Sequence, residues 1–119
     1  MSAVVEEQAR AQVVTDAPDG HTAIRVALRY DPSSQTPSVR IAMPGSPVEQ
    51  EWALPRAVLE QGLRTPVGSG DVRVWPCGRV QAVIEFHTEG GVTVLQFDCA
   101  ALARFLRHTY AATATATPS

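Results

Sequence analysis

Alternation of apolar and polar residues is the feature of this sequence that most restricts its fold. Between Thr22 and Tyr30, large apolar side chains occupy every second position, and Arg25 and Arg29 lie between them. Successive side chains of a strand point to opposite faces, so the pattern predicts a strand with one buried and one solvated face. Comparable patterns predict strands over residues 39–43, 48–54, 71–75, 80–87 and 92–97.

Two helices are expected among these strands. Pro55 suits the first turn of a helix that ends at Gln61, and Gly62 then favours a left-handed cap. Asp98 is a good N-cap for a second helix over residues 99 to about 110. The first helix is short, and the second carries an apolar stripe at helical spacing.

The segment from Leu63 to Pro76 divides the strands into two groups. Its residues 68–71, Gly-Ser-Gly-Asp, predict a turn, because glycine adopts positive φ at little cost. The next strand is expected to end at Pro76, which cannot donate to a sheet ladder. Residues 3–15 contain both helix-favouring and strand-favouring stretches, so propensity leaves this segment open. The order of elements predicts an α+β fold.

Three aromatic residues are the main candidates for packing. Trp52 and Phe105 each lie on the apolar side of an element whose other side is polar, so both are expected in the core. Trp75 lies opposite Val72 and Val74 on its strand. We expect it to pack on a second face of the sheet or at a subunit interface rather than to act as a free recognition residue.

The composition restricts both domain number and chemistry. A chain of 119 residues fits one domain, expected over residues 1–110, and the alanine- and threonine-rich residues 111–119 are expected to be a disordered tail. All ten basic residues are arginines. The absence of lysine excludes a P-loop lysine, a pyridoxal Schiff base and a lysine general base.

Catalytic, cofactor and metal sites find little support in the sequence. The two cysteines and three histidines lack the spacing of metal ligands. Cys99 at a helix start gains thiolate character from the helix dipole, which Asp98 opposes. Glu6 with Glu7 and Glu49 with Glu51 are better explained as solvated carboxylates than as acid–base pairs. We therefore expect no enzyme activity, no cofactor and no metal.

Arg25, Arg29 and Arg40 fall on the solvated faces of neighbouring predicted strands. They are the candidate contacts for an acidic partner protein. The alternative is a single-stranded nucleic-acid-binding module, in which bases stack on exposed aromatic residues in a basic groove. A net charge of −2 and the commitment of aromatic residues to the core make that alternative, and nucleic acid as a partner, less favoured.

Three segments carry a resemblance to a known family. Leu28–Pro32, Trp52 with Val58–Leu63, and Gly68–Pro76 resemble, in order and spacing, the SsgA-like proteins, regulators of sporulation-linked cell division in actinomycetes. The resemblance covers roughly Val4 to His108, and Gly-Asp-Val-Arg-Val-Trp-Pro is its most specific piece. The residues that it marks as motif or structural positions are Tyr30, Asp31, Trp52, Gly62, Gly70, Asp71, Trp75 and Pro76.

The resemblance implies a strand within residues 3–15 and a whirly-like fold. That fold has about seven antiparallel strands in two sheets and two main helices. The family is also described as forming a bell-shaped trimer, so we expect a homo-oligomer, with a trimer favoured and Trp75 as its candidate contact. The sequence departs from the family after Asp31-Pro32, and we expect it to lack a further acidic helical segment that relatives often carry.

The function that the resemblance implies is that of a non-enzymatic regulator or adaptor of septum-site control. Its expected partner is the tubulin-like division protein FtsZ or another SsgA-like protein. The N-terminal residues lack the basic and apolar regions of a signal peptide, and no apolar run reaches the ~18 residues of a membrane span. We therefore expect a cytoplasmic protein that acts at division septa.

Overall fold

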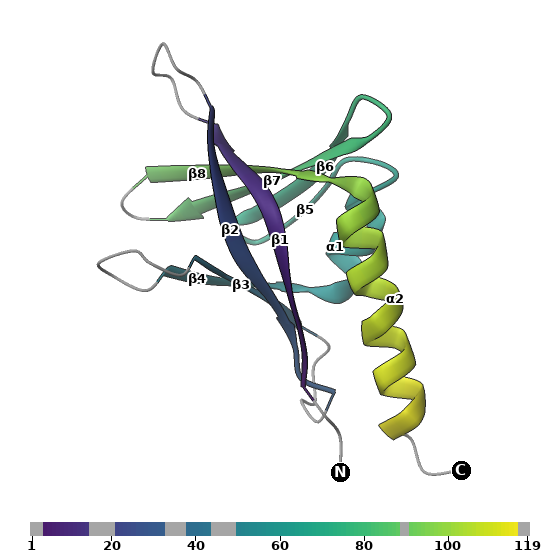
Figure 1. Ribbon diagram of the computed structural model, residues 1–119. Helices are drawn as coiled ribbons and strands as arrows, with labels where there is room; N and C mark the ends of the chain where they lie inside the picture. Colours follow the sequence, from purple (N-terminus) through teal and green to yellow (C-terminus); the bar gives the residue numbers. More distant parts are fainter. Residues whose placement is uncertain (1–3, 15–20, 33–37, 44–49, 89–90, 117–119) are drawn as a thin grey trace.

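The computed structural model describes residues 4–14, 21–32, 38–43, 50–88 and 91–116. They form eight strands and two helices (Figure 1). In chain order these are β1 (Val5–Val14), β2 (His21–Tyr30), β3 (Ser38–Met43), β4 (Gln50–Pro55), α1 (Arg56–Gly62), β5 (Val67–Ser69), β6 (Val72–Cys77), β7 (Gln81–Thr88), β8 (Gly91–Asp98) and α2 (Cys99–Ala116). The predicted α+β class is confirmed.

All eight strands belong to one antiparallel sheet, in the order β4-β3-β2-β1-β8-β7-β6-β5. The expected antiparallel strands are confirmed, but the described residues form eight of them rather than about seven, and the expectation of two sheets is wrong. The reason is β1, which pairs with β2 along its whole length and with β8 through residues 11–14. This shared strand joins the two groups of strands, and its pairing with β8 connects residues 80 to 86 positions apart. The more specific whirly-like assignment stays a prediction.

The eighth strand, β5, lies where the sequence predicted only a turn. Residues 67–69 pair with residues 72–74 of β6, so the turn is reduced to Gly70 and Asp71. Gly70 has a φ of 58°, a value that glycine adopts without the clash that a Cβ causes. Three residues that include glycine are too few to display an alternation, which explains why this strand was missed. The described residues of each half thus form four strands followed by a helix.

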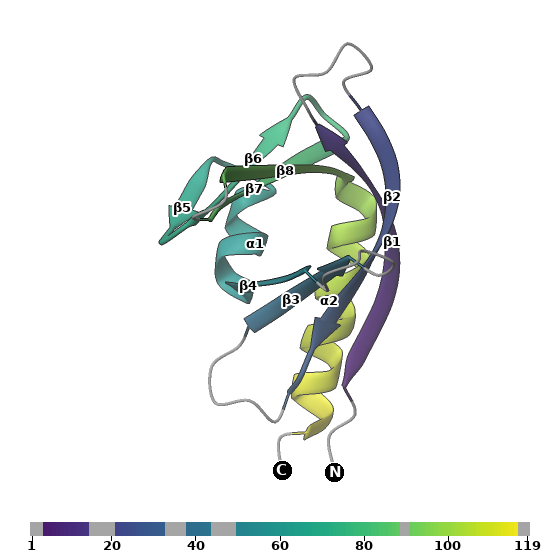
Figure 2. The same ribbon diagram turned by 90° about the vertical axis from the view of Figure 1, so that its left-hand side faces the viewer.

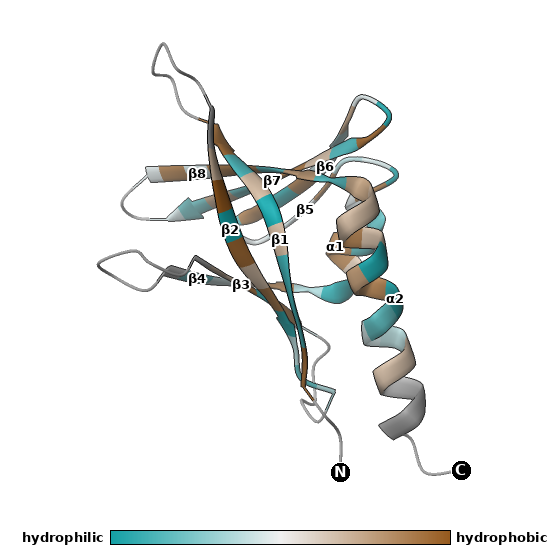
Figure 3. Ribbon diagram, viewed as in Figure 1, coloured by the Kyte–Doolittle hydropathy of each residue, from teal (hydrophilic) through white to brown (hydrophobic). Residues whose placement is uncertain are grey.

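The sheet curves so that strands from its two halves face each other across the core (Figure 2). Trp52 of β4 stacks on Phe86 of β7 with ring centroids 4.8 Å apart and an angle of 14° between the rings. Trp52 is partly buried against the core, whereas Phe105 of α2 is fully buried, as predicted. Apolar and hydrophilic residues alternate along β2 (Figure 3), and Val26 and Leu28 have no exposed surface.

Gly62 has a different role from the one that the sequence predicted. It is the last residue of α1, and no left-handed cap follows, because Leu63 has a φ of −73°. An added Cβ at Gly62 would overlap both Cβ and Cγ1 of Val74 on β6 and lie 3.2 Å from its carbonyl carbon. Glycine therefore allows the end of α1 to pack directly on β6.

Helix α2 continues to Ala116, six residues beyond its expected end near Tyr110. Much of the segment expected to be a disordered tail is therefore helical, and residues 117–119 lie outside the described part of the chain. Alanine has the highest helix propensity, and adding residues to an existing helix costs far less than starting one. The assignment of residues 1–110 to a single domain stays a prediction.

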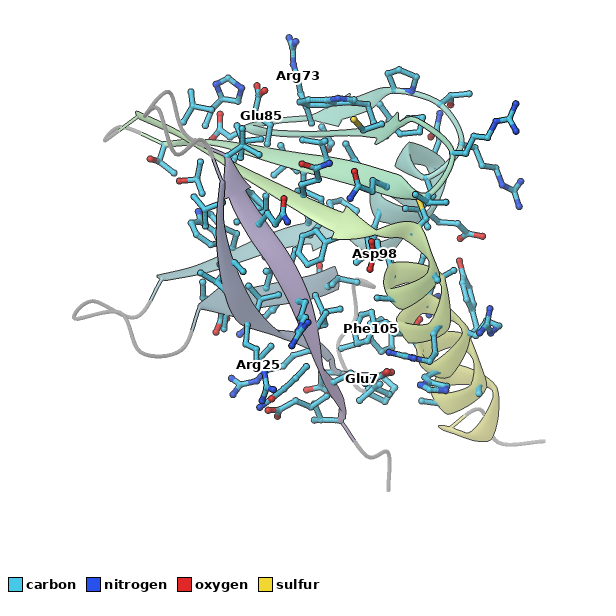
Figure 4. All side chains as sticks on the ribbon, turned by 45° about the horizontal axis from the view of Figure 1, so that its top comes forward. Glu7, Arg25, Arg73, Glu85, Asp98 and Phe105 are labelled. Atoms are coloured by element: carbon cyan, nitrogen blue, oxygen red, sulfur yellow. The ribbon has the colours of Figure 1, made fainter. Side chains whose placement is uncertain are left out.

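Glu7 of β1 ties α2 to the inner face of the sheet. Its carboxylate lies 2.5 Å from Nδ1 of His108 and 3.6 Å from Nε of Arg104. Phe105, which lies between these two residues in the sequence of α2, is fully buried in the core between the helix and the sheet. Figure 4 shows Glu7 on the α2 side of β1 and β2 and Arg25 on the other side. The face of the sheet that the helices cover is called the inner face, and the opposite face is called the outer face.

Candidate functional site

The outer face of β1, β2 and β3 carries the three arginines singled out in the sequence. Arg29 lies directly opposite Arg40 in the β2–β3 register, and Arg25 lies four residues before Arg29 on β2. The structure adds Arg10 of β1, which lies directly opposite Arg25. Sequence reasoning missed Arg10 because the strand expected within residues 3–15 had no assigned register or partner strand. These four residues, Arg10, Arg25, Arg29 and Arg40, are called the arginine face below.

Two of the four arginines have acidic neighbours. Nε of Arg29 lies 3.4 Å from Oε2 of Glu6, and Nη1 of Arg40 lies 3.3 Å from Oε1 of Glu51. All four of these side chains are largely exposed, so each pair contributes at most about 1 kcal/mol. The two contacts do, however, reduce the positive charge at this end of the face.

Arg10 and Arg25 differ from the other pair. Both are exposed, and within the described ranges neither has a carboxylate at ion-pair distance. Like charges directly opposite each other on neighbouring strands destabilise a sheet. The arrangement therefore costs stability, and a bound acidic group would remove that cost.

A shallow hollow lies beside the paired end of the arginine face. Its volume is about 470 Å³, and Arg29 and Arg40 line it together with the exposed side chain of Asp31. Its polar lining among the described residues consists of these two arginines, the Asp31 carboxylate and the Ser38 hydroxyl. No aromatic side chain of the described residues lines it, so it offers no surface on which a nucleic-acid base could stack.

Tyr30 turns inward from the same strand and is almost fully buried. The guanidinium of Arg56 lies between two rings, 4.9 Å from the centroid of Tyr30 and 3.9 Å from that of Tyr110. The Tyr110 hydroxyl donates to Glu60 of α1. That hydrogen bond, and then burial, raises the pKa of Tyr110. This cluster joins β2, α1 and α2 and has a structural role.

Trp75 lies on the outer face of the other half of the sheet, half-buried next to Val83 of β7. It lines an open hollow of about 490 Å³ with the β5 residues Val67 and Gly68. In Figure 4, Arg73 projects outward from this region near Glu85. The sheet order separates Trp75 from the arginine face, so the two candidate surfaces are distinct.

Pro76 does not end its strand, which continues to Cys77. The Asp71 carbonyl accepts a hydrogen bond from the His87 N–H at 2.7 Å. The backbone N–H and C=O groups of odd-numbered β6 residues therefore point toward β7, and those of even-numbered residues point away from it. The nitrogen of Pro76 consequently points toward β5, whose pairing with β6 stops at Val74. No ladder hydrogen bond is lost, which is why proline is tolerated here.

Comparison with known proteins identifies the family. Residues 24–117 match the family model described as "Streptomyces sporulation and cell division protein, SsgA". The chain belongs to the SsgA family. Among its relatives, sporulation-specific cell division protein SsgB of Streptomyces coelicolor is 34% identical over 92 residues, which cover 75% of this chain and 67% of that protein. SsgB of Salinispora tropica is 32% identical over 93 residues, which cover 73% of this chain and 64% of that protein.

Solved structures of SsgA-family proteins share this fold. A structure reported with mutations in SsgB that correlate to longitudinal cell division during sporulation of Streptomyces coelicolor matches with a TM-score of 0.81 and 28% identity, over 94% of this chain and 90% of that one. The crystal structure of an SsgA-like sporulation-specific cell division protein from Thermobifida fusca matches with a TM-score of 0.70 and 25% identity, over 92% of this chain and 81% of that one. These relatives support a role in sporulation-linked division for this chain, which spans about two thirds of the length of the SsgB proteins.

Among the described residues of this SsgA-family chain, the candidate catalytic groups do not converge. Glu6 and Glu7 point to opposite faces of β1 and bind different partners. Among the described residues, no three His, Cys, Asp or Glu side chains are grouped to hold a metal ion. Neither described helix combines the length and apolar character that crossing a membrane requires.

Cys99 behaves differently from the sequence expectation. Burial, and then the charge of Asp98, raise the pKa of its thiol. Cys77 is exposed and Cys99 is half-buried. With a disulfide reagent at pH 8, we expect one fast and one slow thiol, the slow one accelerating as the pH rises and Cys99 ionises. Cys77→Ser should remove the fast phase; loss of the slow phase instead would contradict the assignment.

Proposed function

We propose that this protein is a non-enzymatic adaptor of sporulation-specific cell division that acts in the cytoplasm at division septa. It binds an acidic surface of FtsZ or of another SsgA-like protein through the arginine face. The observation that carries the proposal is the direct opposition of Arg10 and Arg25, without a neighbouring carboxylate in the described chain. Membership of a family of sporulation division proteins supplies the biological setting.

Electrostatics explain why such a face suits an acidic protein. A carboxylate that lies between Arg10 and Arg25 gains from both charges and relieves their repulsion. Charged interfaces of this kind mainly increase the association rate and the specificity, and salt weakens them. The binding is therefore expected to weaken as ionic strength rises.

Co-sedimentation with FtsZ polymers tests the proposal. The wild type should pellet with polymers, and the Arg25→Ser/Arg29→Ser/Arg40→Ser variant should remain largely in the supernatant. Its urea unfolding midpoint should stay close to wild type, because exposed substitutions usually change stability by within about 0.5 kcal/mol each. Arg79→Ser, in the turn before β7, is a control for the loss of an exposed arginine elsewhere.

Two results count against the adaptor. One is a wild type that binds neither FtsZ nor another SsgA-like protein. The other is a wild type that retards single-stranded DNA at physiological salt while ignoring division proteins, which would favour the nucleic-acid-binding alternative.

We also propose that the protein forms a homo-oligomer, a trimer, with Trp75 at the contact. The support is an open sheet with two edge strands, β4 and β5, and a half-buried tryptophan next to one of them. Light scattering at micromolar concentration should give the mass of a trimer, and Trp75→Ser should reduce it. A monomeric wild type would exclude the trimer, and an unchanged mass for the variant would exclude Trp75 as the contact.

A further inference from the structure

A groove runs between the end of α1 and the first half of α2. Figures 1 and 2 show these two segments side by side. The groove has a volume of about 370 Å³. Its lining residues are Glu60, Leu63, Arg64, Cys99, Ala103, Leu106, Arg107 and Tyr110. It lies on the helix side of the sheet, whereas the arginine face lies on the outer side.

The floor of the groove is apolar because the apolar side of α2 is wide. Leu102, Phe105 and Leu106 are buried in the core. Cys99, Ala103 and Leu106 follow one another at intervals of four and three residues, which places them along the edge of this apolar side. Because α1 ends at Gly62, it covers this edge only in part, and Cys99 and Ala103 keep some exposure.

The rim of the groove is positively charged. Arg64, just beyond α1, and Arg107 of α2 are both exposed, and no carboxylate in the described chain lies at ion-pair distance from either. The rim also contains one carboxylate, that of Glu60, but it accepts the hydrogen bond of Tyr110. The groove thus offers an apolar floor beside two cations and one hydrogen-bonded carboxylate, and within the described chain that carboxylate pairs with neither cation.

We propose that this groove binds an acidic amphipathic helix of a partner protein. Apolar side chains of that helix pack on Leu63, Cys99 and Ala103, and its carboxylates pair with Arg64 and Arg107. An amphipathic helix in an apolar groove is a common mode of peptide recognition, and the charges of the rim select an acidic one. A protein with this groove and the arginine face can hold two partners at once, which goes beyond the single interaction proposed above.

Alkylation of Cys99 gives a direct readout, because its side chain lines the groove. The probe is a synthetic peptide of about 14 residues with leucines at helical spacing and glutamates elsewhere, long enough to form a helix when bound. In the Cys77→Ser protein, this peptide should slow alkylation of Cys99 several-fold. A matched peptide with lysine in place of each glutamate should not.

Variants separate the groove from the arginine face. Arg64→Ser/Arg107→Ser should weaken binding of the acidic peptide roughly tenfold at low salt, the combined effect of two exposed charge pairs. Arg10→Ser/Arg25→Ser should bind the peptide as the wild type does, whether or not it still binds FtsZ. Fluorescence anisotropy of a labelled peptide measures both affinities.

Four outcomes overturn the proposal. The first is that the acidic peptide, at millimolar concentration, leaves Cys99 alkylation unchanged. The second is that the lysine peptide protects Cys99 equally. The third is that the Arg64→Ser/Arg107→Ser variant binds the acidic peptide with wild-type affinity. The fourth is protection of Cys99 by phosphatidylglycerol vesicles but not by the peptide, which would make the groove a site for anionic lipid.

Discussion

Replacing Phe105 with alanine is expected to lower the free energy of unfolding by about 3–5 kcal/mol. Phe105 has no exposed surface and lies where α2 crosses the inner face of the sheet (Figure 4). Truncation removes its contacts with the core and leaves a cavity between the curved sheet and α2. Movement of these two elements fills such a cavity only in part. Urea unfolding followed by circular dichroism measures the change.

Arg104→Ala is the matched control on the same helix. Arg104 is exposed, and its 3.6 Å contact with Glu7 is a surface ion pair, so its loss should cost at most about 1 kcal/mol. If Phe105→Ala unfolds at the same urea concentration as this control, Phe105 does not anchor α2 in the core.

Replacing Gly62 with alanine is expected to destabilise the protein by about 1–3 kcal/mol, a cost typical of overpacking. Alanine is the better helix former by about 1 kcal/mol, so propensity alone predicts the opposite sign. Overlap with the Val74 side chain decides the sign, because the added methyl meets Cβ itself, which no rotamer change can move away. The end of α1 has to shift away from β6.

The neighbouring position supplies the control for Gly62→Ala. Gln61 is exposed in the last turn of α1, so Gln61→Ala should leave the urea midpoint unchanged or raise it slightly. An increase in stability for Gly62→Ala would show that α1 does not pack closely on Val74. A Gly62→Ala variant that is less stable and in which the end of α1 has moved away from β6 would agree with the structure.

Local patterns in the sequence predicted much of this fold. The alternation in β2 placed the buried Val26 and Leu28 on one face and the exposed Arg25 and Arg29 on the other, although Ala27 of that second face is also buried. Asp98 correctly marked the residue before α2. These features depend on neighbours within a few residues, which is the range over which periodicity and capping act.

Features that depend on distant contacts were not predictable in this way. The pairing of β1 with β8, which makes one sheet of two, connects opposite ends of the chain. The reason for Gly62 lies in Val74, which belongs to another strand. Arg10 belongs to the arginine face because β1 pairs with β2 in the register that sets Arg10 opposite Arg25. The apolar groove on α2 likewise depends on where α1 ends.

The most direct test of the arginine face compares two double variants that each remove two positive charges. Binding to FtsZ polymers is titrated for Arg10→Ser/Arg25→Ser and for Arg29→Ser/Arg40→Ser at low and at physiological salt. We expect the first variant to lose more affinity, because Glu6 and Glu51 already neutralise part of the charge that the second removes. The difference should shrink at higher salt. Wild-type binding by both variants would contradict the assignment of this face to partner recognition.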